Sequence, residues 1–296
     1  MAILSNIIKN KRLVGRKNWE NYIEGLKSNT TAKNKKQIKK QLKQKLVEAV
    51  AKRLPKKRFG LLFSGGVDSS TIALIAKKLR ANFICYSVGT GNSKDAAEAK
   101  KAAKQLKLRL KYKIFNLKEA ERIIKKAAAI TGKPDVVNVG VASVEIAAAE
   151  IAKKDGIKAF FTGLGSEEIF AGYQRHETAK DVNKECWTGL KNMWGRDLVR
   201  DCKVAAAMKI SFLTPFLDKE LIIEAMKIHG KYKISGSDKK IILREVAAEL
   251  GLPMQFAFRK KLAAQYGSGF DKAIEKLARK SGFRCKKEYL ESLMLR

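Results

Sequence analysis

Apolar and polar positions between residues 58 and 162 follow two alternating patterns. Short apolar runs predict strands at 58–63, 82–88, 109–115 and 157–162. Between them, apolar residues recur at helical spacing over 71–79, 93–106, 118–130 and 141–154. Strands that alternate with helices predict right-handed crossovers and a parallel sheet covered by helices on both faces.

The segments on either side of this pattern are not strand-like. From about Asn34, apolar residues recur at helical spacing and lysines fill the opposite face, which predicts a surface helix. Residues 1–30 look irregular or weakly helical. From about Gln174 the chain has helical periodicity and no convincing strand. We therefore expect one α/β core with a helical second lobe.

Composition narrows the class of protein. The chain has 296 residues, of which 45% are apolar and 31% charged, as in water-soluble globular proteins. No apolar run approaches the roughly 18 residues that a membrane-spanning helix needs. The first residues lack the apolar length and the cleavage site of a signal peptide. We expect a cytoplasmic protein that does not bind membranes.

Cysteine and histidine usage excludes two kinds of site. The four cysteines lie far apart with no Cys-x-x-Cys pair, and there are only two histidines. This spacing supports neither a disulfide framework nor a zinc centre. We expect any catalysis to use backbone amides, lysine, carboxylates and a bound ion.

The charge is strongly positive, with 63 Lys and Arg against 29 Asp and Glu, a net charge of +34. Residues 1–58 alone carry 18 basic and three acidic side chains. One interpretation is a surface that binds a polyanion, with tRNA as the obvious candidate. The other is a lysine-rich solvated surface. Aromatic residues are not interleaved with the basic runs, as a base-stacking surface would require, and this favours the second interpretation.

The strongest chemical signal is Phe-Ser-Gly-Gly-Val-Asp-Ser-Ser at 63–70, between the first predicted strand and a helix. Gly65 and Gly66 let the backbone approach an anion closely, and the amides of the helix N-terminus point at the same place. Three serines add hydroxyl donors. A carboxylate such as Asp68 fits beside phosphates when a divalent cation lies between them. The string is neither a Walker loop nor a Gly-x-Gly-x-x-Gly motif.

This loop resembles the pyrophosphate-binding loop of the ATP pyrophosphatase (PP-loop) superfamily, whose members split ATP into AMP and pyrophosphate while adenylating a substrate. Three later segments resemble motifs of asparagine synthetases in the family's order: Phe-Thr-Gly-Leu-Gly-Ser-Glu-Glu-Ile-Phe-Ala-Gly-Tyr at 161–173, Thr-Pro-Phe-Leu-Asp at 214–218, and Arg-x-Lys at 259–261 with Gly-x-Gly at 267–269. The resemblance covers roughly residues 35–280. It is closest to stand-alone archaeal-type synthetase domains and to the asparagine synthetase domain-containing protein of eukaryotes.

The resemblance implies a fold and domain boundaries. The fold would be adenine nucleotide alpha hydrolase-like, an α/β parallel sheet with flanking helices and a helical C-terminal lobe. Residues 1–34 would be a basic N-terminal extension, and residues 35–296 the PP-loop ATP-binding domain. Within that domain the α/β core would cover about 56–173 and the helical lobe about 174–296.

The resemblance also implies residue roles. Asp68 and Glu167 would act in catalysis by holding Mg²⁺, with Glu167 in place of the family's usual Asp. Lys261 would neutralise the charge that builds on the α-phosphate during attack. The residues implied to bind ATP lie in the loop and at the ends of strands: Ser64, Gly65, Gly66, Val67, Asp68, Ser69, Ser70, Val88, Gly89, Thr162, Gly163 and Gly165.

The leading hypothesis is an AMP-forming, ATP- and Mg²⁺-dependent ligase of the asparagine synthetase type. A carboxylate substrate, aspartate by analogy, would attack the α-phosphorus, and ammonia would then displace AMP. No cysteine follows Met1, and the chain upstream of the loop is too short for a glutaminase domain. Free ammonia or a separate glutaminase would therefore supply the nitrogen.

Two departures from the family pattern keep alternatives open. Leu164 stands where the family has a Glu assigned acid–base work in the ammonia step, and leucine cannot accept a proton. Water, ammonia or another carboxylate such as Glu168 could substitute. The family's Glu-x-Arg is also replaced, by Ser211 and Leu213 at its two positions. One alternative is a PP-loop enzyme that adenylates a tRNA base, and another is a non-catalytic ATP-binding scaffold.

Overall fold

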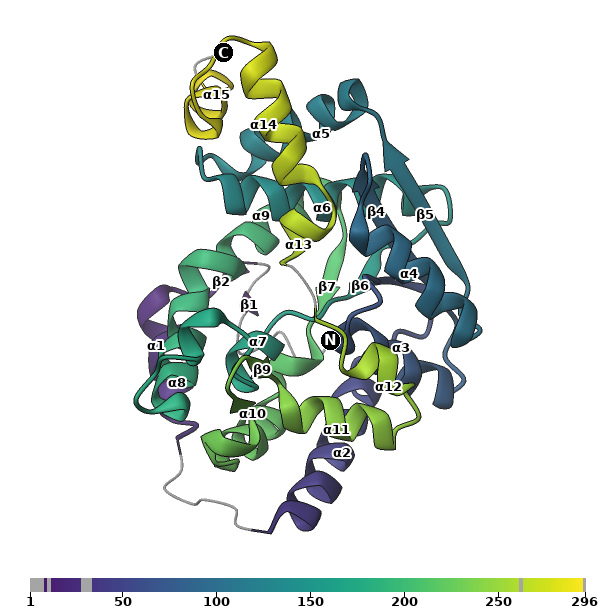
Figure 1. Cartoon of the computed structure of the whole chain (residues 1–296), viewed down its shortest axis with the longest axis vertical. Helices are drawn as coiled ribbons and strands as arrows, with labels where there is room; N and C mark the ends of the chain where they lie inside the picture. The colour runs from purple at the N-terminus through teal and green to yellow at the C-terminus, as the bar shows by residue number, and fades with distance from the viewer. Residues whose placement is uncertain (1–7, 10–11, 28–33, 261–262, 295–296) are drawn as a thin grey trace.

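The computed structural model describes residues 8–9, 12–27, 34–260 and 263–294. Its centre is a parallel sheet of five strands in the order β5-β4-β3-β6-β7 (Figure 1). The strands are β3 (Phe59–Leu62), β4 (Phe83–Thr90), β5 (Leu110–Phe115), β6 (Ala159–Phe161) and β7 (Ser211–Leu213). Chain order runs outward from β3 in both directions and therefore reverses between β3 and β6. In open parallel sheets, ligands bind at such a reversal, outside the carboxyl ends of the strands.

The predicted α/β fold with a parallel sheet is confirmed, and the four predicted strands correspond to β3–β6. The expectation that no strand follows Gln174 is wrong, because β7 pairs in parallel with β6, with Phe212 opposite Phe160. β7 has only three residues, and its first, Ser211, is exposed. So short a run carries no periodicity, and it is strand only because the β6 edge is there to pair with it.

The helices between the strands also confirm the predicted alternation. They are α3 (Val67–Lys78), α4 (Lys94–Gln105), α5 (Leu117–Thr131) and α6 (Val136–Lys153). Local signals set their ends. Asn116 and Glu119 form a capping box at the start of α5, and Gly132, in the left-handed conformation, ends it.

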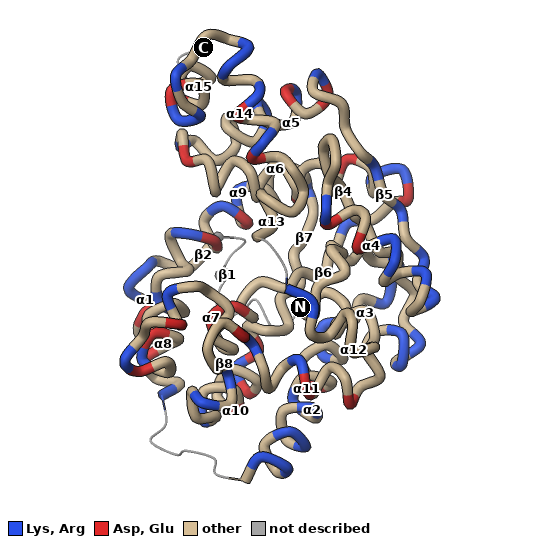
Figure 2. Tube along the Cα trace, in the orientation of Figure 1, with Lys and Arg blue, Asp and Glu red and all other residues tan. Residues whose placement is uncertain are grey.

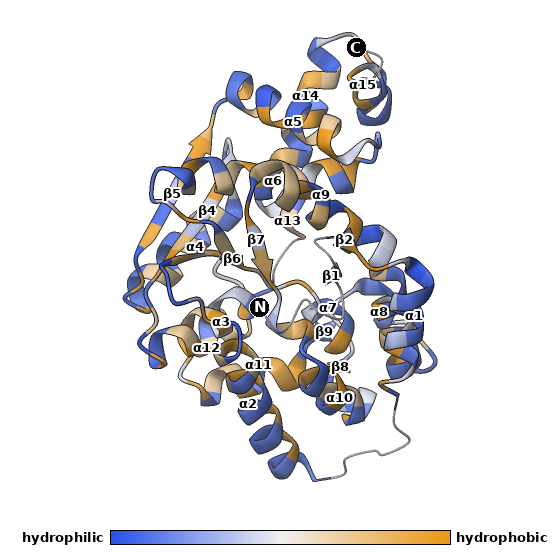
Figure 3. Ribbon diagram, turned by 180° about the vertical axis from the view of Figure 1, so that it is seen from behind, coloured by the Kyte–Doolittle hydropathy of each residue, from blue (hydrophilic) through white to orange (hydrophobic). Residues whose placement is uncertain are grey.

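The sheet separates two apolar cores. On one face α2 (Lys35–Ala51), α3 and α4 cover side chains that include Leu61 and Cys85. On the other face α5, α6 and α14 (Phe270–Lys280) cover Ile84, Tyr86 and Phe160. Successive side chains of a strand point to opposite faces, so one strand supplies both cores. Figure 3 shows the contrast between the largely hydrophobic β7 and the largely hydrophilic α2 on the outside.

The remaining elements are mostly helical, in agreement with the predicted helical lobe. They are α7 (Ser166–Ile169), α8 (Val182–Met193), a π-helical turn (Trp194–Leu198), α9 (Val199–Met208), α10 (Lys219–Lys227), α11 (Ile241–Glu249), α12 (Met254–Ala257), α13 (Ala264–Gly267) and α15 (Lys286–Ser292), with short 3-10 turns and the hairpin β8 (Ile234–Ser235) and β9 (Asp238–Lys239). Within the described ranges, no helix has the length and hydrophobicity to cross a membrane.

The N-terminal segment contains a short hairpin, β1 (Ile8–Lys9) and β2 (Arg12–Leu13), and the helix α1 (Arg16–Glu24). Trp19 of α1 is fully buried, and its Nε1 donates a hydrogen bond to the carbonyl of Leu190 in α8 at 2.9 Å. The segment is thus attached to the helical lobe. The division of the chain at residue 34 stays a prediction.

Lysines and arginines are spread over elements on all sides of the molecule (Figure 2). Those of α2 are not all free in solvent, because Lys35 pairs with Glu245 and Lys39 with Glu249, both on α11. Exposed pairs of this kind contribute little to stability. The positive charge is therefore a property of the whole surface more than of one element.

Candidate active site

The loop between β3 and α3 has a conformation that only glycine permits at one position. Gly65 has φ = +67°, and a Cβ atom there would lie 2.8 Å from the backbone carbonyl oxygen of Glu98 in α4. Gly66 is the N-cap of α3. The tight turn lets the first turn of α3 present backbone N–H groups that the helix itself does not satisfy.

Hydrogen bonds within the loop hold it in shape. The Ser64 N–H donates to Ser69 Oγ at 3.3 Å, and the Gly66 N–H donates to Ser64 Oγ at 3.3 Å. Ser70 Oγ is buried and has no hydrogen-bond partner among the residues that the structure describes. Preorganised N–H groups at a helix N-terminus, with hydroxyls beside them, suit a phosphate group.

A second loop, between β6 and α7, lies directly against the first. A Cβ atom on Gly163 would be 3.0 Å from Asp68 Cβ, so the absence of a side chain there permits the contact. The N–H of Thr162 donates to the carbonyl of Leu213 in β7 at 3.0 Å. Gly165, at φ = +96°, is the N-cap of α7 and packs against Leu217. The strand that sequence reasoning missed thus fixes this second loop.

The two predicted metal-binding carboxylates converge on one atom, Lys240 Nζ. It lies 2.8 Å from Asp68 Oδ1 and 2.8 Å from Glu167 Oε1. Ser166 Oγ lies 3.0 Å from the same nitrogen. Burial disfavours the charged form of Lys240, but Asp68 and Glu167 outweigh it and raise the pKa of the ammonium above its usual value. The structure thereby brings Asp68 and Glu167 together around a buried cation.

These residues fit Mg²⁺, although no three His, Cys, Asp or Glu side chains in the described part of the chain group as a metal site. Mg²⁺ commonly uses one or two carboxylates, water and the phosphates of a substrate. Asp68 and Glu167 supply two carboxylates around a point that already accommodates a positive charge. They would hold the ion only together with phosphates.

Lys240 is the site residue that sequence reasoning missed. The chain has many lysines, and Lys240, the N-cap of α11, stands in none of the motifs that the sequence analysis identified. Nothing in the sequence therefore marked it as a site residue. Two structural features distinguish it. The residue is 4% exposed, and its backbone has φ = +58°, which non-glycine residues rarely adopt.

The ends of β4 and the Gly-x-Gly segment pack closely. The Thr90 N–H donates to the carbonyl of Ser268 at 2.8 Å, and a Cβ on Gly269 would be 2.7 Å from the Thr90 carbonyl oxygen. Gly89 has no room for a side chain either, because a Cβ atom there would lie 2.9 Å from the carbonyl oxygen of Ser268. Val88 and Gly89 therefore lie at the carboxyl end of β4, next to β3 in the sheet, as predicted for nucleotide-binding residues. Their role stays a prediction.

Arg259 connects the Arg-x-Lys segment to the Ser64–Ser70 loop. Its Nη2 donates to the carbonyl of Ser64 at 3.2 Å. Arg244 of α11 in turn donates to the carbonyls of Ala257 at 2.7 Å and Arg259 at 3.1 Å. Lys261, predicted to act on the α-phosphate, lies outside the described residues, and its role stays a prediction.

Glu168 does not lie with Glu167 at the loop. It is 1% exposed, accepts a hydrogen bond from Tyr173 Oη at 2.8 Å and pairs with Arg196. Burial raises its pKa to about 7, with Asp197 adding to the shift and Arg196 opposing it. These contacts join α7 to Tyr173, in the segment that follows it, and to the π-helical turn Trp194–Leu198. Leu164 is half-buried and packs on the apolar core.

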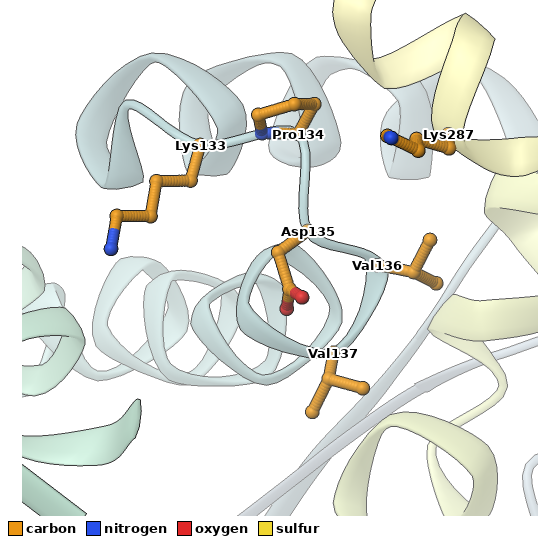
Figure 4. A pocket seen from close by; sticks show the side chains of 6 residues that line it. All are labelled: Lys133, Pro134, Asp135, Val136, Val137 and Lys287. Atoms are coloured by element: carbon orange, nitrogen blue, oxygen red, sulfur yellow. The ribbon is translucent and has the colours of Figure 1, made fainter. Parts of the chain in front are cut away.

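One surface hollow lies elsewhere, at the connection of α5 to α6 beside α15 (Figure 4). It is lined by Lys133, Pro134, Asp135, Val136, Val137 and Lys287. None of the predicted site residues that the structure describes lines it. The hollow is therefore separate from the site at the carboxyl ends of the strands.

Comparison with known proteins gives a consistent result. The sequence model of the asparagine synthase family matches residues 41–181 and 174–283. A protein of Methanocaldococcus jannaschii, provisionally named glutamine-hydrolyzing asparagine synthetase 1, is 35% identical over 276 residues, 80% of this chain and 51% of the relative. Asparagine synthetase B (glutamine-hydrolyzing) of Escherichia coli is 28% identical over 273 residues, 86% of this chain and 48% of the relative.

The chain spans about half the length of the curated relatives it matches. Among solved structures, the NMN synthetase of Francisella tularensis is similar with a TM-score of 0.42 and 12% identity, over 90% of this chain and 94% of that one. The family match covers most of the chain and includes the loop, both carboxylates and Lys240. The chain belongs to the asparagine synthase family.

Proposed function

We propose that this chain is an ATP-dependent, AMP-forming ligase that activates a carboxylate, aspartate by analogy with the family, for amide formation with ammonia. The observation that supports the proposal is the meeting of Asp68 and Glu167 between β3 and β6, where the order of the strands reverses. One carboxylate follows β3 and the other follows β6, so both face the place where open parallel sheets bind nucleotides.

The chain's own residues would bind and orient ATP. The Ser64–Ser70 loop and the first turn of α3 would hold the β- and γ-phosphates through N–H and hydroxyl donors. Val88, Gly89, Thr162 and Gly163 would line the adenosine pocket. Asp68 and Glu167 would hold Mg²⁺, whose positive charge would offset the negative charge of the phosphates. Lys261 would stabilise the charge on the α-phosphate as the carboxylate attacks.

The second half of the reaction would proceed without the family's usual base. Leu164 cannot accept a proton. Glu168 is buried, accepts a hydrogen bond from Tyr173 and pairs with Arg196, which favours a structural role for it. Ammonia would therefore attack the acyl group as neutral NH₃, which needs no base at position 164. The proton released as the amide forms and AMP leaves would pass to water or to a second ammonia molecule.

The test is exchange of labelled pyrophosphate into ATP in the presence of single amino acids or total tRNA. We expect exchange that depends on aspartate and on Mg²⁺. Asp68→Asn should abolish it, because the variant loses a metal-binding charge. Asp135→Asn is the matched control: Asp135 is an exposed N-cap of α6 in the separate hollow, asparagine also caps helices, and exchange should be unchanged.

The net charge of +34 favours a second candidate, adenylation of a tRNA base. In that case tRNA, and not aspartate, would stimulate exchange. ATP binding without exchange under any condition would instead favour the non-catalytic scaffold. That hypothesis rests on Leu164, which replaces the family's Glu. The same assay therefore separates all three functions.

A further inference from the structure

Lys240 occupies the place between the two carboxylates that are proposed to hold the metal. Its Nζ lies 2.8 and 2.9 Å from the two oxygens of Asp68 and 2.8 Å from Glu167 Oε1. Ser166 Oγ, at 3.0 Å, adds a fourth oxygen. The ammonium thus has the oxygen partners that a bound cation would need.

An ammonium and a divalent cation cannot share this position. Two positive groups a few ångströms apart repel each other strongly where water is scarce, and Lys240 is 4% exposed. The same carboxylate oxygens would also have to bind both. Because the ammonium is attached to the chain, it competes with free metal at any metal concentration.

A nucleotide changes this competition. Its triphosphate would lie on the Ser64–Ser70 loop, which includes Asp68 in the first turn of α3. Phosphate oxygens offer the displaced ammonium new anionic partners, and they complete the ligand set of the metal. The side chain of lysine is flexible enough to exchange one set of oxygens for the other.

We propose that Lys240 closes the Asp68–Glu167 site to free divalent cations and gives it up only to a metal that arrives with a nucleotide. The release of the site by a nucleotide rests on the proposed function. The exclusion of free metal ions depends only on the protein. With such a closure, metal and nucleotide bind to this site together.

The test uses Mn²⁺ as the probe, without nucleotide, with bound Mn²⁺ measured by electron paramagnetic resonance. We expect no saturable binding at this site by the wild-type protein and at least tenfold tighter binding by Lys240→Met. Lys239→Met is the matched control, because Lys239 is adjacent but pairs with Glu177 at the surface. It should behave like the wild type. Equal Mn²⁺ binding by the wild type and Lys240→Met overturns the proposal.

Two further measurements guard against a variant that folds poorly. The double variant Lys240→Met, Glu167→Gln relieves the unpaired charge and should lose the gain in Mn²⁺ binding. The wild type needs no substitution: Mn²⁺ should raise its melting temperature only when ATP is also present. A rise with Mn²⁺ alone overturns the proposal.

Failure of this inference and failure of the proposed function give different results. If pyrophosphate exchange is absent but Lys240→Met gains Mn²⁺, the closed site is supported and the ligase function is not. If exchange depends on aspartate while the wild type binds free Mn²⁺ as tightly as Lys240→Met, the ligase function stands and Lys240 has no such role.

Discussion

Gly65 and Gly156 share almost the same backbone angle, φ = +67° and +69°, in very different surroundings. A Cβ on Gly65 would meet the backbone of Glu98 at 2.8 Å, whereas a Cβ on Gly156 would meet nothing within 4 Å. We predict that Gly65→Ala weakens ATP binding by at least about tenfold and lowers the free energy of unfolding by about 1–3 kcal/mol, since the loop must move.

Gly156→Ala is the control for backbone strain without the clash. It should lower the free energy of unfolding by about 1 kcal/mol and leave ATP binding unchanged. Titration calorimetry and urea unfolding measure the two quantities. If both variants bind ATP like the wild type, the Ser64–Ser70 loop does not hold phosphates.

His176 makes the free energy of unfolding depend on pH. Its ring is 1% exposed, and Nδ1 accepts a hydrogen bond from the Tyr173 N–H at 3.0 Å. Burial lowers the pKa of His176 to about 4, and Arg175 adds to the effect. The unfolded chain takes up a proton near the usual pKa of about 6.5, while the folded protein does not. Stability from this group is thus present above pH 6.5 and is lost as the pH falls toward 4.

We predict that His176→Asn, which retains an acceptor for Tyr173, removes this dependence. Between about pH 7 and about pH 4.5, the wild type should lose about 2 kcal/mol more of its unfolding free energy than the variant does. Urea unfolding at both pH values measures the difference. His229→Asn changes the other, exposed histidine and should follow the wild type. Parallel losses in wild type and His176→Asn would contradict the prediction.

The site residues differ in how far sequence could predict them. Asp68 and Glu167 stand inside motifs, so their types and spacing carry the signal. Lys240 takes its role from burial between two loops that lie more than 70 positions away along the chain. No local pattern encodes that contact, because it exists only after the sheet brings the loops together.

At the scale of elements, the turn before α10 joins two parts of the fold. Asp218 accepts hydrogen bonds from the N–H groups of Glu220 and Leu221, and so caps α10. It also accepts from Arg53 Nη1 at 2.9 Å, and both side chains are buried. The Pro-Phe-Leu-Asp motif, which contains none of the predicted site residues, thus has a structural role that its contacts explain.

We predict that Asp218→Ala lowers the free energy of unfolding by about 3–5 kcal/mol, because Arg53 is left as a buried charge without its partner. Asp181→Ala removes the exposed N-cap of α8, which forms no such ion pair with the residues that the structure describes, and should cost about 1 kcal/mol. Urea unfolding compares the two. Equal costs would mean that the Arg53–Asp218 pair adds nothing beyond the cap.

The strands show which elements a sequence can predict. β3 and β4 carry several consecutive apolar residues and lie in the middle of the sheet, so composition alone indicates them. β7 is three residues long and lies at the sheet edge. It depends on the backbone of β6 and not on its own pattern. α1 was similarly only weakly indicated, because its stability comes from Trp19 packing on α8.

For the whole molecule, the net charge of +34 predicts that it binds nucleic acids in a salt-dependent way. We expect total tRNA to bind at low ionic strength and to lose about a hundredfold or more in affinity between about 50 and about 200 mM salt, since the contacts are to phosphates. Filter binding over a salt series measures this, with heparin as a competitor. Tight binding of one tRNA at high salt would instead favour the tRNA-modifying function.

The β6–β7 pair has a consequence for biosynthesis. During translation, β3 and β4 emerge from the ribosome more than a hundred residues before β7 and Lys240. Until residues 211–213 emerge, the Thr162 N–H lacks its partner, and until Lys240 follows, Asp68 and Glu167 lack their ammonium. The nascent chain can build its first βαβ units early, but the ion pairs of Lys240 with Asp68 and Glu167 form only after residue 240 has been made.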